Sequence, residues 1–443
     1  MPQSNLLQAL QYLQTALQAR LNHHFSKEPQ REPFKLPPIT FAQNDGQPFT
    51  QFIQQTQLKS EELLVVLLAL VPHVYPNFLD SIISTFLPSG GNFPEFGGIK
   101  GKNHRGTLPT GETALFLLAG NDLERRFQVQ PILSMAHFLV NEKVIYLEDI
   151  PNGEPAMSGR LIIDPDYVDL FTLNMVTLPK MSSSFPAEHL STQMDWDDLV
   201  LNPSTFNQIK ELETWVRHHH TLMHDWGMQR KLKPGYRALF HGPPGTGKTL
   251  TATLLGKSTG QDVFRIDLSN VVSKYIGETE KNLANLFDKA QNKNWILFFD
   301  EADAIFGKRT GVRDAHDKYA NQEVSYLLQR IESYPGLTIL ASNFKTNIDE
   351  AFVRRFNAII YFPSPKANER AVIWKKAFPA QAILAANVDL DQIAQKYELT
   401  GSHIMNITQY VCLQALEKKT NIINAEDLRQ GIVRELMKEG KTA

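Results

Sequence analysis

Hydrophobic residues near the start of the chain recur at helical spacing. They are Leu6, Leu10, Leu13, Leu17 and Leu21. Intervals of three and four predict an amphipathic helix over residues 5–22. We expect this helix to pack on its own domain; the alternative is an arm that binds a partner or stabilises a ring.

The pattern up to about residue 180 predicts a small α+β domain. Segments 60–71, 77–87 and 112–119 have the composition of buried helices. Two apolar stretches, 144–147 and 160–163, flank a Pro-Asn-Gly turn and predict a hairpin. Helices followed by a hairpin are compatible with a winged helix. The loop 89–111, with seven glycines, is expected to be a surface excursion rather than a ligand contact.

The second half alternates between strand and helix patterns. The predicted strands are residues 238–241, 263–267, 296–300, 338–342 and 359–362. This alternation predicts a five-stranded parallel sheet with helices on both faces. From residue 368 onwards the pattern is helical only, which predicts a helical lid.

These patterns divide the chain into six parts. The predicted parts are an N-terminal helix (1–25), a proline-rich linker (26–50), a helical or winged-helix-like domain (51–180), a second linker (181–195), an α/β core (196–367) and a helical lid (368–443). A chain of 443 residues exceeds one domain at ~150 residues each, which agrees with this division.

Charge and cysteine content narrow the classes of protein. Residues 1–195 carry 13 basic and 19 acidic side chains, against 32 and 28 in the remainder. An acidic first half argues against nucleic acid as its partner.

The single cysteine, Cys412, excludes a disulfide framework. The longest apolar run has nine residues and the start resembles no signal peptide, so we expect a cytoplasmic protein without membrane insertion.

The strongest chemical motif follows the first predicted strand of the second half. It reads Gly242-Pro243-Pro244-Gly245-Thr246-Gly247-Lys248-Thr249, and Leu250 continues into a predicted helix. This is the phosphate-binding P-loop pattern in its strand–loop–helix context. Backbone N–H groups surround the phosphates, Lys248 approaches the β- and γ-phosphates, and the Thr249 hydroxyl binds Mg²⁺.

A second motif ends the strand at 296–300. Asp300 and Glu301 follow four apolar residues. A buried strand holds its last carboxylate rigidly, so Asp300 is the expected Mg²⁺ ligand. Glu301, one residue further, is the expected base for the attacking water.

The two motifs together resemble the AAA family of the AAA+ ATPases, and further segments support the resemblance over about 195–443. The segments are Trp196-Asp197-Asp198-Leu199-Val200, Ile339-Leu340-Ala341-Ser342-Asn343, Ile348-Asp349-Glu350-Ala351-Phe352-Val353-Arg354-Arg355-Phe356 and Thr400-Gly401-Ser402-His403-Ile404.

The resemblance implies roles for these segments. Asp198, Leu199 and Val200 would lie near the adenine, and Gly401 with Ser402 would begin a lid helix beside the nucleotide. Asn343 would orient the water. Arg354 and Arg355 would reach a neighbouring subunit's ATP, which implies a homo-oligomeric ring, six-membered by the family pattern, with ATP and Mg²⁺ as cofactors.

A further segment resembles the first pore loop of such rings. It comprises Lys274, Tyr275, Ile276 and Gly277. An exposed aromatic at the ring axis would grip an extended polypeptide; the alternative is that Tyr275 packs at the start of a helix. A charged stretch, 308–318, occupies the place of a second pore loop, and for it the two interpretations stay open.

The expected function is ATP-driven threading, disassembly or remodelling of a protein client. The first half combined with the segment 302–336 also resembles ATPases of bacterial phage-tail-like contractile injection systems. The alternatives are a nucleic-acid-associated switch or loader that recognises nucleic acid with its N-terminal domain, and a scaffold that binds ATP without turnover.

The sequence contains no His-Glu-x-x-His motif, which excludes a fused zinc protease of the membrane-bound AAA type. His218, His219 and His220 are expected to lie on a helix surface.

Overall fold

The two halves of the chain, which differ in hydrophobic pattern, fold as separate compact units. They comprise Met1–Leu178 and Pro179–Ala443. The computed structural model describes residues 5–26, 34–39, 45–91, 93–182, 185–267, 278–291, 293–302, 325–343, 354–438 and 440. Each unit is considered by itself below.

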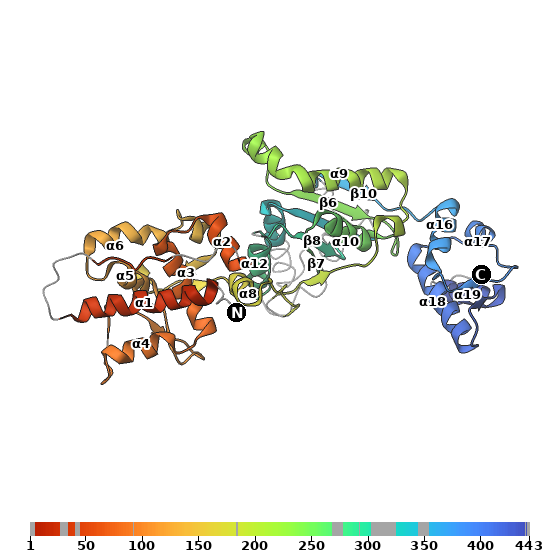
Figure 1. Cartoon of the computed structure of the whole chain (residues 1–443). Coiled ribbons are helices and arrows are strands. Elements are labelled where there is room, and N and C mark those ends of the chain that lie inside the picture. The colour runs from red at the N-terminus through yellow and green to blue at the C-terminus, as the bar shows by residue number, and fades with distance from the viewer. Residues whose placement is uncertain are drawn as a thin grey trace, which may run out of the picture. The chain divides into compact units, whose positions relative to one another are not determined.

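The first unit is mainly helical. Its elements are α1 (Asn5–Phe25), α2 (Pro48–Thr56), α3 (Ser60–Val74), α4 (Phe78–Phe86), β1 (Ile99–Lys100), β2 (Thr107–Leu108), α5 (Gly111–Ala119), α6 (Leu123–Val129), α7 (Phe138–Asn141), β3 (Ile145–Leu147), β4 (Leu161–Ile163) and α8 (Pro165–Leu173). Helix α3 packs against α1, α5, α8 and β4 (Figure 1). Because α3 is enclosed in this way, every residue from 63 to 71 is buried, as expected of a helix that is apolar on all sides.

Several predictions for this unit are confirmed. Helix α1 buries Leu13, Leu17 and Leu21 in the unit's own core, so it is a packed helix. The predicted hairpin is present, with Ile145 opposite Ile163 and Leu147 opposite Leu161 in antiparallel register. A winged helix is not shown. In the glycine-rich loop, β1 and β2 pair, and Asp80 anchors them by accepting from Lys100 Nζ and Thr107 N at 2.8 and 2.7 Å.

The second unit contains a six-stranded sheet. Its strands are β5 (Glu188–Leu190), β6 (Tyr236–His241), β7 (Val263–Asp267), β8 (Ile296–Asp300), β9 (Leu337–Ser342) and β10 (Ala358–Tyr361), in the order β10-β6-β9-β8-β7-β5. The five predicted strands are all present and parallel. The prediction of a purely parallel five-stranded sheet is wrong in one respect, because β5 adds to β7 in the antiparallel direction.

Helices cover both faces of this sheet, as predicted (Figure 1). Alternate residues of β8 face opposite ways. Phe298 packs with residues of α9 (Pro203–His220) and α10 (Lys248–Thr259), whereas the ring of Phe299 contacts Phe287 of α12 (Glu278–Gln291). Strands buried on both faces read as continuous apolar runs, which explains why the sequence pattern located them.

The last part of the chain is mainly helical and has its own core. Its elements are α16 (Ala367–Ala377), β11 (Ile383–Leu384), α17 (Leu390–Lys396), α18 (Gly401–Glu417), β12 (Ile422–Ile423) and α19 (Ala425–Lys438). The expectation of helices alone is wrong in one respect, because two short strands, β11 and β12, pair in parallel there. The indole of Trp374 on α16 is fully buried in this core against residues of α17, α18 and α19.

Among the described helices, none is by itself long and apolar enough to cross a membrane. Helices α3 and α4 reach the length and apolar composition of a membrane span only when they are taken together, and the two are bent by 106° relative to each other.

Candidate nucleotide-binding site

The P-loop lies between β6 and α10, as predicted. Gly245 and Gly247 have φ angles of +72° and +95°, a backbone region that favours glycine. A Cβ on Gly245 would lie 1.9 Å from Ser402 Oγ, so the close approach of the lid helix also requires glycine there. The loop therefore has the wound backbone that presents N–H groups to phosphate.

Lys248 lies at the centre of this loop and is buried, with 8% of its surface exposed. Its Nζ donates to the carbonyl oxygens of Gly242 and Pro243 at 2.7 and 3.0 Å. The same ammonium is 3.3 Å from Asn343 Oδ1, at the end of β9. The structure therefore brings two of the predicted site residues, one at the start of α10 and one just after β9, into contact.

The acidic pair ends β8 on the same edge of the sheet. Asp300 accepts from the backbone N–H of Glu301 at 3.1 Å, and its Oδ2 is 3.5 Å from Arg265 Nε on β7. Glu301 is exposed and has a φ of +53°, an uncommon conformation for a non-glycine residue. Strain of this kind concentrates at functional sites. The next residue, Ala302, is fixed by donating to Ala341 O at 2.9 Å.

The segments predicted to flank the nucleotide also lie beside the P-loop. A Cβ on Gly247 would be 3.0 Å from Leu199 Cδ1. On the lid, Ser402 N–H donates to Gly245 O at 3.3 Å, at the first turn of α18. The backbone carbonyl of Asp197 accepts from Lys376 of α16, which links this segment to the lid.

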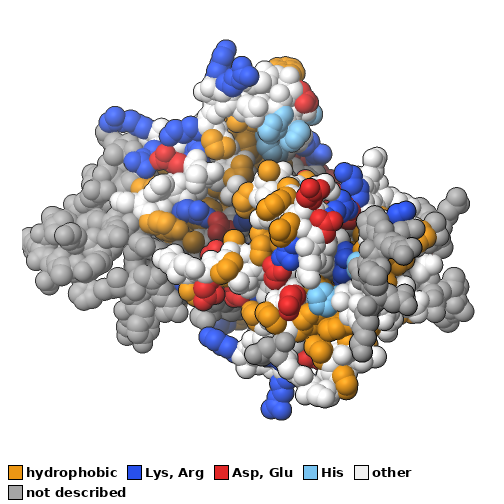
Figure 2. Space-filling view, turned by 90° about the vertical axis from the view of Figure 1, so that its left-hand side faces the viewer, with side chains coloured by type: hydrophobic (Ala, Val, Ile, Leu, Met, Phe, Trp, Pro, Cys, Tyr) orange, Lys and Arg blue, Asp and Glu red, His pale blue; other side chains and the backbone are white. Residues whose placement is uncertain are grey.

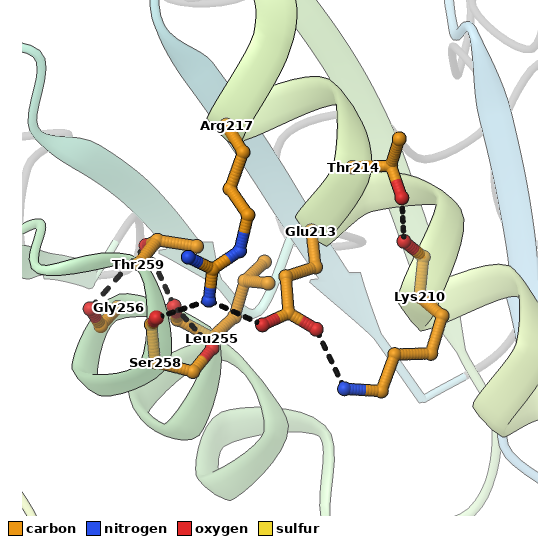
Figure 3. Close-up of polar contacts among 8 residues, drawn as sticks. All are labelled: Lys210, Glu213, Thr214, Arg217, Leu255, Gly256, Ser258 and Thr259. Carbon is orange, nitrogen blue, oxygen red and sulfur yellow. Dashed lines mark hydrogen bonds and ion pairs between the residues drawn. The ribbon is translucent and has the colours of Figure 1, made fainter.

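Helix α9 is joined to the C-terminal end of α10 by a charged cluster (Figure 3). Glu213 accepts from Lys210 Nζ at 2.6 Å and from Arg217 Nη2 at 2.9 Å. Arg217 Nη2 also donates to Ser258 O at 2.5 Å. Burial raises the pKa of Glu213, but these hydrogen bonds outweigh it and lower the pKa to about 2.

The two predicted trans-acting arginines lie away from this site. Arg354 and Arg355 precede β10, whose first residue, Ala358, pairs with Ala238 near the start of β6. They therefore lie at the edge of the sheet where the strands begin, whereas the P-loop follows the strand ends. Both are exposed, and Arg355 Nη1 is 2.6 Å from Glu332 Oε1.

Glu332, which pairs with Arg355, was not singled out by the sequence patterns. Burial raises the pKa of its carboxyl, but the hydrogen bond from Lys233 and the charges of Arg355 and Arg237 lower it below its usual value. Arg265, which pairs with Asp300, was not singled out either. Both contacts join segments distant in sequence, so no local motif marks them.

Some predictions fall on residues outside the described stretches. These are the pore-loop residues Lys274, Tyr275, Ile276 and Gly277, the charged stretch 308–318, and residues 348–353. Among the described residues, no group of three or more His, Cys, Asp or Glu side chains could hold a metal ion. His218, His219 and His220 lie at the end of α9, with His218 and His220 exposed as expected.

The residues present fit Mg²⁺ and a nucleoside triphosphate. The loop combines glycines in the left-handed region with a buried ammonium. Thr249 lies in the first turn of α10 and Asp300 ends β8 at the same sheet edge, which supplies the hydroxyl and carboxylate oxygens that Mg²⁺ prefers. Glu301 is exposed one residue beyond, as a water-activating base requires.

A P-loop after a central parallel strand, an acidic strand end, an intervening strand ending in Asn and a helical lid define a P-loop ATPase fold of the AAA type. Residues 238–364 match the family "ATPase family associated with various cellular activities (AAA)". This match confirms the AAA resemblance predicted from the motifs over these residues. It likewise supports ATP and Mg²⁺ as the cofactors.

Three similar proteins are A-like 1 forms of the katanin p60 ATPase-containing subunit. They come from Danio rerio, Rattus norvegicus and Homo sapiens and are 33%, 34% and 33% identical over 211 residues. The aligned part covers 44% of this chain and 42% of each relative. The chain thus spans less than half the length of the curated relatives it matches.

Proposed function

We propose that this protein is a Mg²⁺-dependent ATPase that assembles into a ring, six-membered by the family pattern, and remodels a protein client. The AAA module and relatives named as ATPase-containing subunits support ATP hydrolysis. The contact between Lys248 and Asn343, beside the strand that ends in Asp300 and Glu301, supports an assembled active site.

Each residue has a distinct task in this proposal. Lys248 would bind the β- and γ-phosphates, and Asn343 would orient the attacking water. Glu301 would accept the proton of that water as its oxygen approaches the γ-phosphorus. Thr249 and Asp300 would hold Mg²⁺, which when bound neutralises charge on the phosphate oxygens.

The observation that carries the ring proposal is the separation of the arginines from their own P-loop. The parallel strands run from the sheet edge beside the arginines to the sheet edge beside the P-loop. They have four to six residues, four in β10 and six in β6. At about 3.3 Å per residue, the edges are roughly 13–20 Å apart. This separation from their own P-loop supports the proposal that Arg354 and Arg355 act at the ATP of a neighbouring subunit, as an arginine finger acting in trans does.

A subunit-mixing experiment tests this arrangement. Glu301→Gln should bind ATP without turnover, and an Arg354→Ala/Arg355→Ala double variant should also be inactive. In a ring that contains both variants, some active sites form between two different subunits. The double-variant subunit supplies an intact Glu301, and its Glu301→Gln neighbour supplies the arginines. We expect the mixture to recover about a tenth or more of wild-type activity, since a trans arginine contributes ~10³–10⁵ in rate.

Adding Lys248→Ala to the double variant provides the matched control. That triple variant mixed with Glu301→Gln offers no complete site, so the mixture should stay inactive. An inactive first mixture, with both variants shown to co-assemble, would contradict the trans role of the arginines.

The client and its pathway are the finer part of the proposal. We infer that Tyr275 lines the ring axis and contacts an extended polypeptide. The resemblance to injection-system ATPases makes a sheath, tube or cargo protein the client to test first. We further propose a cytoplasmic location and the domain boundaries predicted from the sequence, with β5 counted as part of the ATPase core.

A nucleic-acid-associated switch is the alternative function. Such a protein normally presents a basic face. On the face shown in Figure 2, basic, acidic and hydrophobic side chains are interspersed. Residues 1–195 carry 19 acidic against 13 basic side chains, and this balance favours a protein client.

A further inference from the structure

A cavity of about 700 Å³ lies in the first unit, separate from the ATPase module. It is bounded by the C-terminal part of α1, the segment 34–36, the first turn of α3 and the connection from α5 to α6. Its volume falls within the range of ~300–1,000 Å³ typical of small-molecule sites. No residue of the nucleotide-binding site contributes to it.

The wall of this cavity contains a buried arginine. Arg20 is 4% exposed and lies in the last turns of α1, on the same buried face as Ala16 and Leu17. Its Nε and Nη2 donate to the carbonyl oxygens of Leu117 and Leu118 at 3.0 and 2.9 Å. Its Cζ lies 3.7 Å from the ring centroid of Phe34, which also lines the cavity.

Within the described part of the chain, Arg20 has no carboxylate at ion-pair distance, and Asp122 acts on its charge only from further away. Burial lowers the pKa of Arg20 to about 10, so the guanidinium remains charged at neutral pH. The carbonyl end of α5 offsets part of this charge, but a buried charge is ordinarily paired. A guanidinium has five N–H donors, and two carbonyl contacts leave capacity for an anion.

The other charged residues of the wall do not remove this excess. Lys35 and Arg125 add two positive charges. The two carboxylates are Glu61, which pairs with Arg125, and Asp122, which accepts from the backbone N–H of Arg125 at 3.1 Å as the N-cap of α6. Three cationic side chains in the wall therefore outnumber two carboxylates. Gly120, with φ +62°, completes the wall; a Cβ there would lie 3.0 Å from Arg20 Nη1.

We propose that this cavity binds a small molecule that carries a carboxylate or phosphate group on an aromatic or apolar body. Arg20 and Lys35 contact the anion, and the side chains of Phe34, Leu36 and Leu118 contact the apolar part. The anion supplies the counter-charge that Arg20 lacks, in the planar geometry that arginine recognises. The site would give the first unit a ligand of its own, whatever the function of the ATPase module.

Calorimetric titration of the full chain tests the proposal, with the P-loop first saturated with Mg-ADP so that it does not bind the probes. The probes are phenyl phosphate, benzoate and neutral benzyl alcohol. At least one anionic probe should bind about tenfold or more tighter than benzyl alcohol, because charge-assisted hydrogen bonds to arginine are the strong ones. The two anions distinguish a phosphate from a carboxylate ligand.

Three variants locate the binding. Lys35→Gln should weaken the preferred anion by about two- to fivefold, the effect of one exposed charge. Arg20→Lys, which keeps the charge but loses the planar fork, should weaken it by about tenfold. Lys102→Gln, at an exposed lysine outside the cavity, should leave affinity unchanged. If Arg20→Lys lowers the melting temperature below the assay range, Lys35→Gln decides.

Two results would overturn the proposal. One is that neither anion binds better than benzyl alcohol. The other is that Lys35→Gln, together with a folded Arg20→Lys, keeps wild-type affinity. In either case Arg20 only caps the carboxyl end of α5, and its substitution alters stability alone.

Discussion

At the scale of single residues, Glu213 connects the surface of α9 to the helix that follows the P-loop. The carboxyl is 8% exposed and is held by Lys210 and Arg217, and Arg217 reaches Ser258 on α10 (Figure 3). Since its pKa is about 2 in the folded protein and near 4.5 otherwise, its ionised form is preferred by the fold. The stabilisation is therefore complete above pH 4.5 and is lost as the pH falls toward 2.

Glu213→Gln should accordingly destabilise the second unit by about 1–3 kcal/mol at pH 7, the usual cost of losing charged hydrogen bonds at a buried group. The gap from wild type should shrink between pH 5 and pH 3, because Glu213 of the unfolded chain then becomes protonated while the folded carboxyl is still ionised. Urea denaturation at pH 7, 5 and 3 measures it. Glu211→Gln, on the same helix and exposed, is the control. A gap that is independent of pH would show that the carboxylate charge is not the cause.

At the scale of elements, β5 attaches the segment before the ATPase module to the open edge of the sheet. Its register places Glu188 opposite Arg265 and Leu190 opposite Val263. Just before it, Phe185 is 5% exposed and its ring contacts Phe264 and Trp295, at centroid distances of 5.6 and 6.1 Å. Ring packing of this kind stabilises the strand more than three residues of ladder would.

Phe185→Ala should therefore lower the free energy of unfolding of the second unit by about 3–4 kcal/mol, the cost of removing a buried ring. Phe185→Leu, which retains most of the volume, should cost under about 1.5 kcal/mol. Thermal melting combined with hydrogen exchange on β7 checks both. If β7 amides exchange no faster in Phe185→Ala, β5 does not protect that edge.

The contrast between β5 and the other strands shows what sequence patterns resolve. The five parallel strands are apolar runs such as Ile296–Asp300, because both of their faces are covered. Strand β5 has three residues, among them Glu188 and His189, and follows Pro186, a residue rare inside strands. Its pairing depends on the free edge of β7, which is a tertiary property.

The same distinction applies to the candidate site. Lys248, Thr249, Asp300 and Glu301 belong to local motifs, so their types and spacing predict them. The pairings of Asp300 with Arg265 and of Arg355 with Glu332 depend on strand order and on side-chain reach across segments. The two residues of each pair have no characteristic spacing in the sequence, and only the folded sheet brings them together.

At the scale of the whole molecule, the proposed ring requires that hydrolysis be separable from work on a client. The proposed nucleotide-binding residues lie at the ends of β6, β8 and β9, whereas Tyr275 comes in sequence after β7 and before α12. A residue that contacts the client but not the nucleotide should affect stimulation and leave basal turnover intact. A core aromatic would instead affect stability and turnover together.

Tyr275→Ala should therefore keep basal ATPase activity within about twofold and the melting temperature near wild type, while abolishing stimulation by an unfolded protein such as casein. Loss of a buried ring would instead cost ~3–5 kcal/mol and lower both together. Tyr275→Phe, which retains the ring, should preserve much of the stimulation and serves as the control. Single- and double-stranded DNA, assayed in parallel, should not stimulate the wild type. Stimulation by DNA and not by casein would favour the nucleic-acid switch, and wild-type stimulation of Tyr275→Ala by casein would remove Tyr275 from the client path.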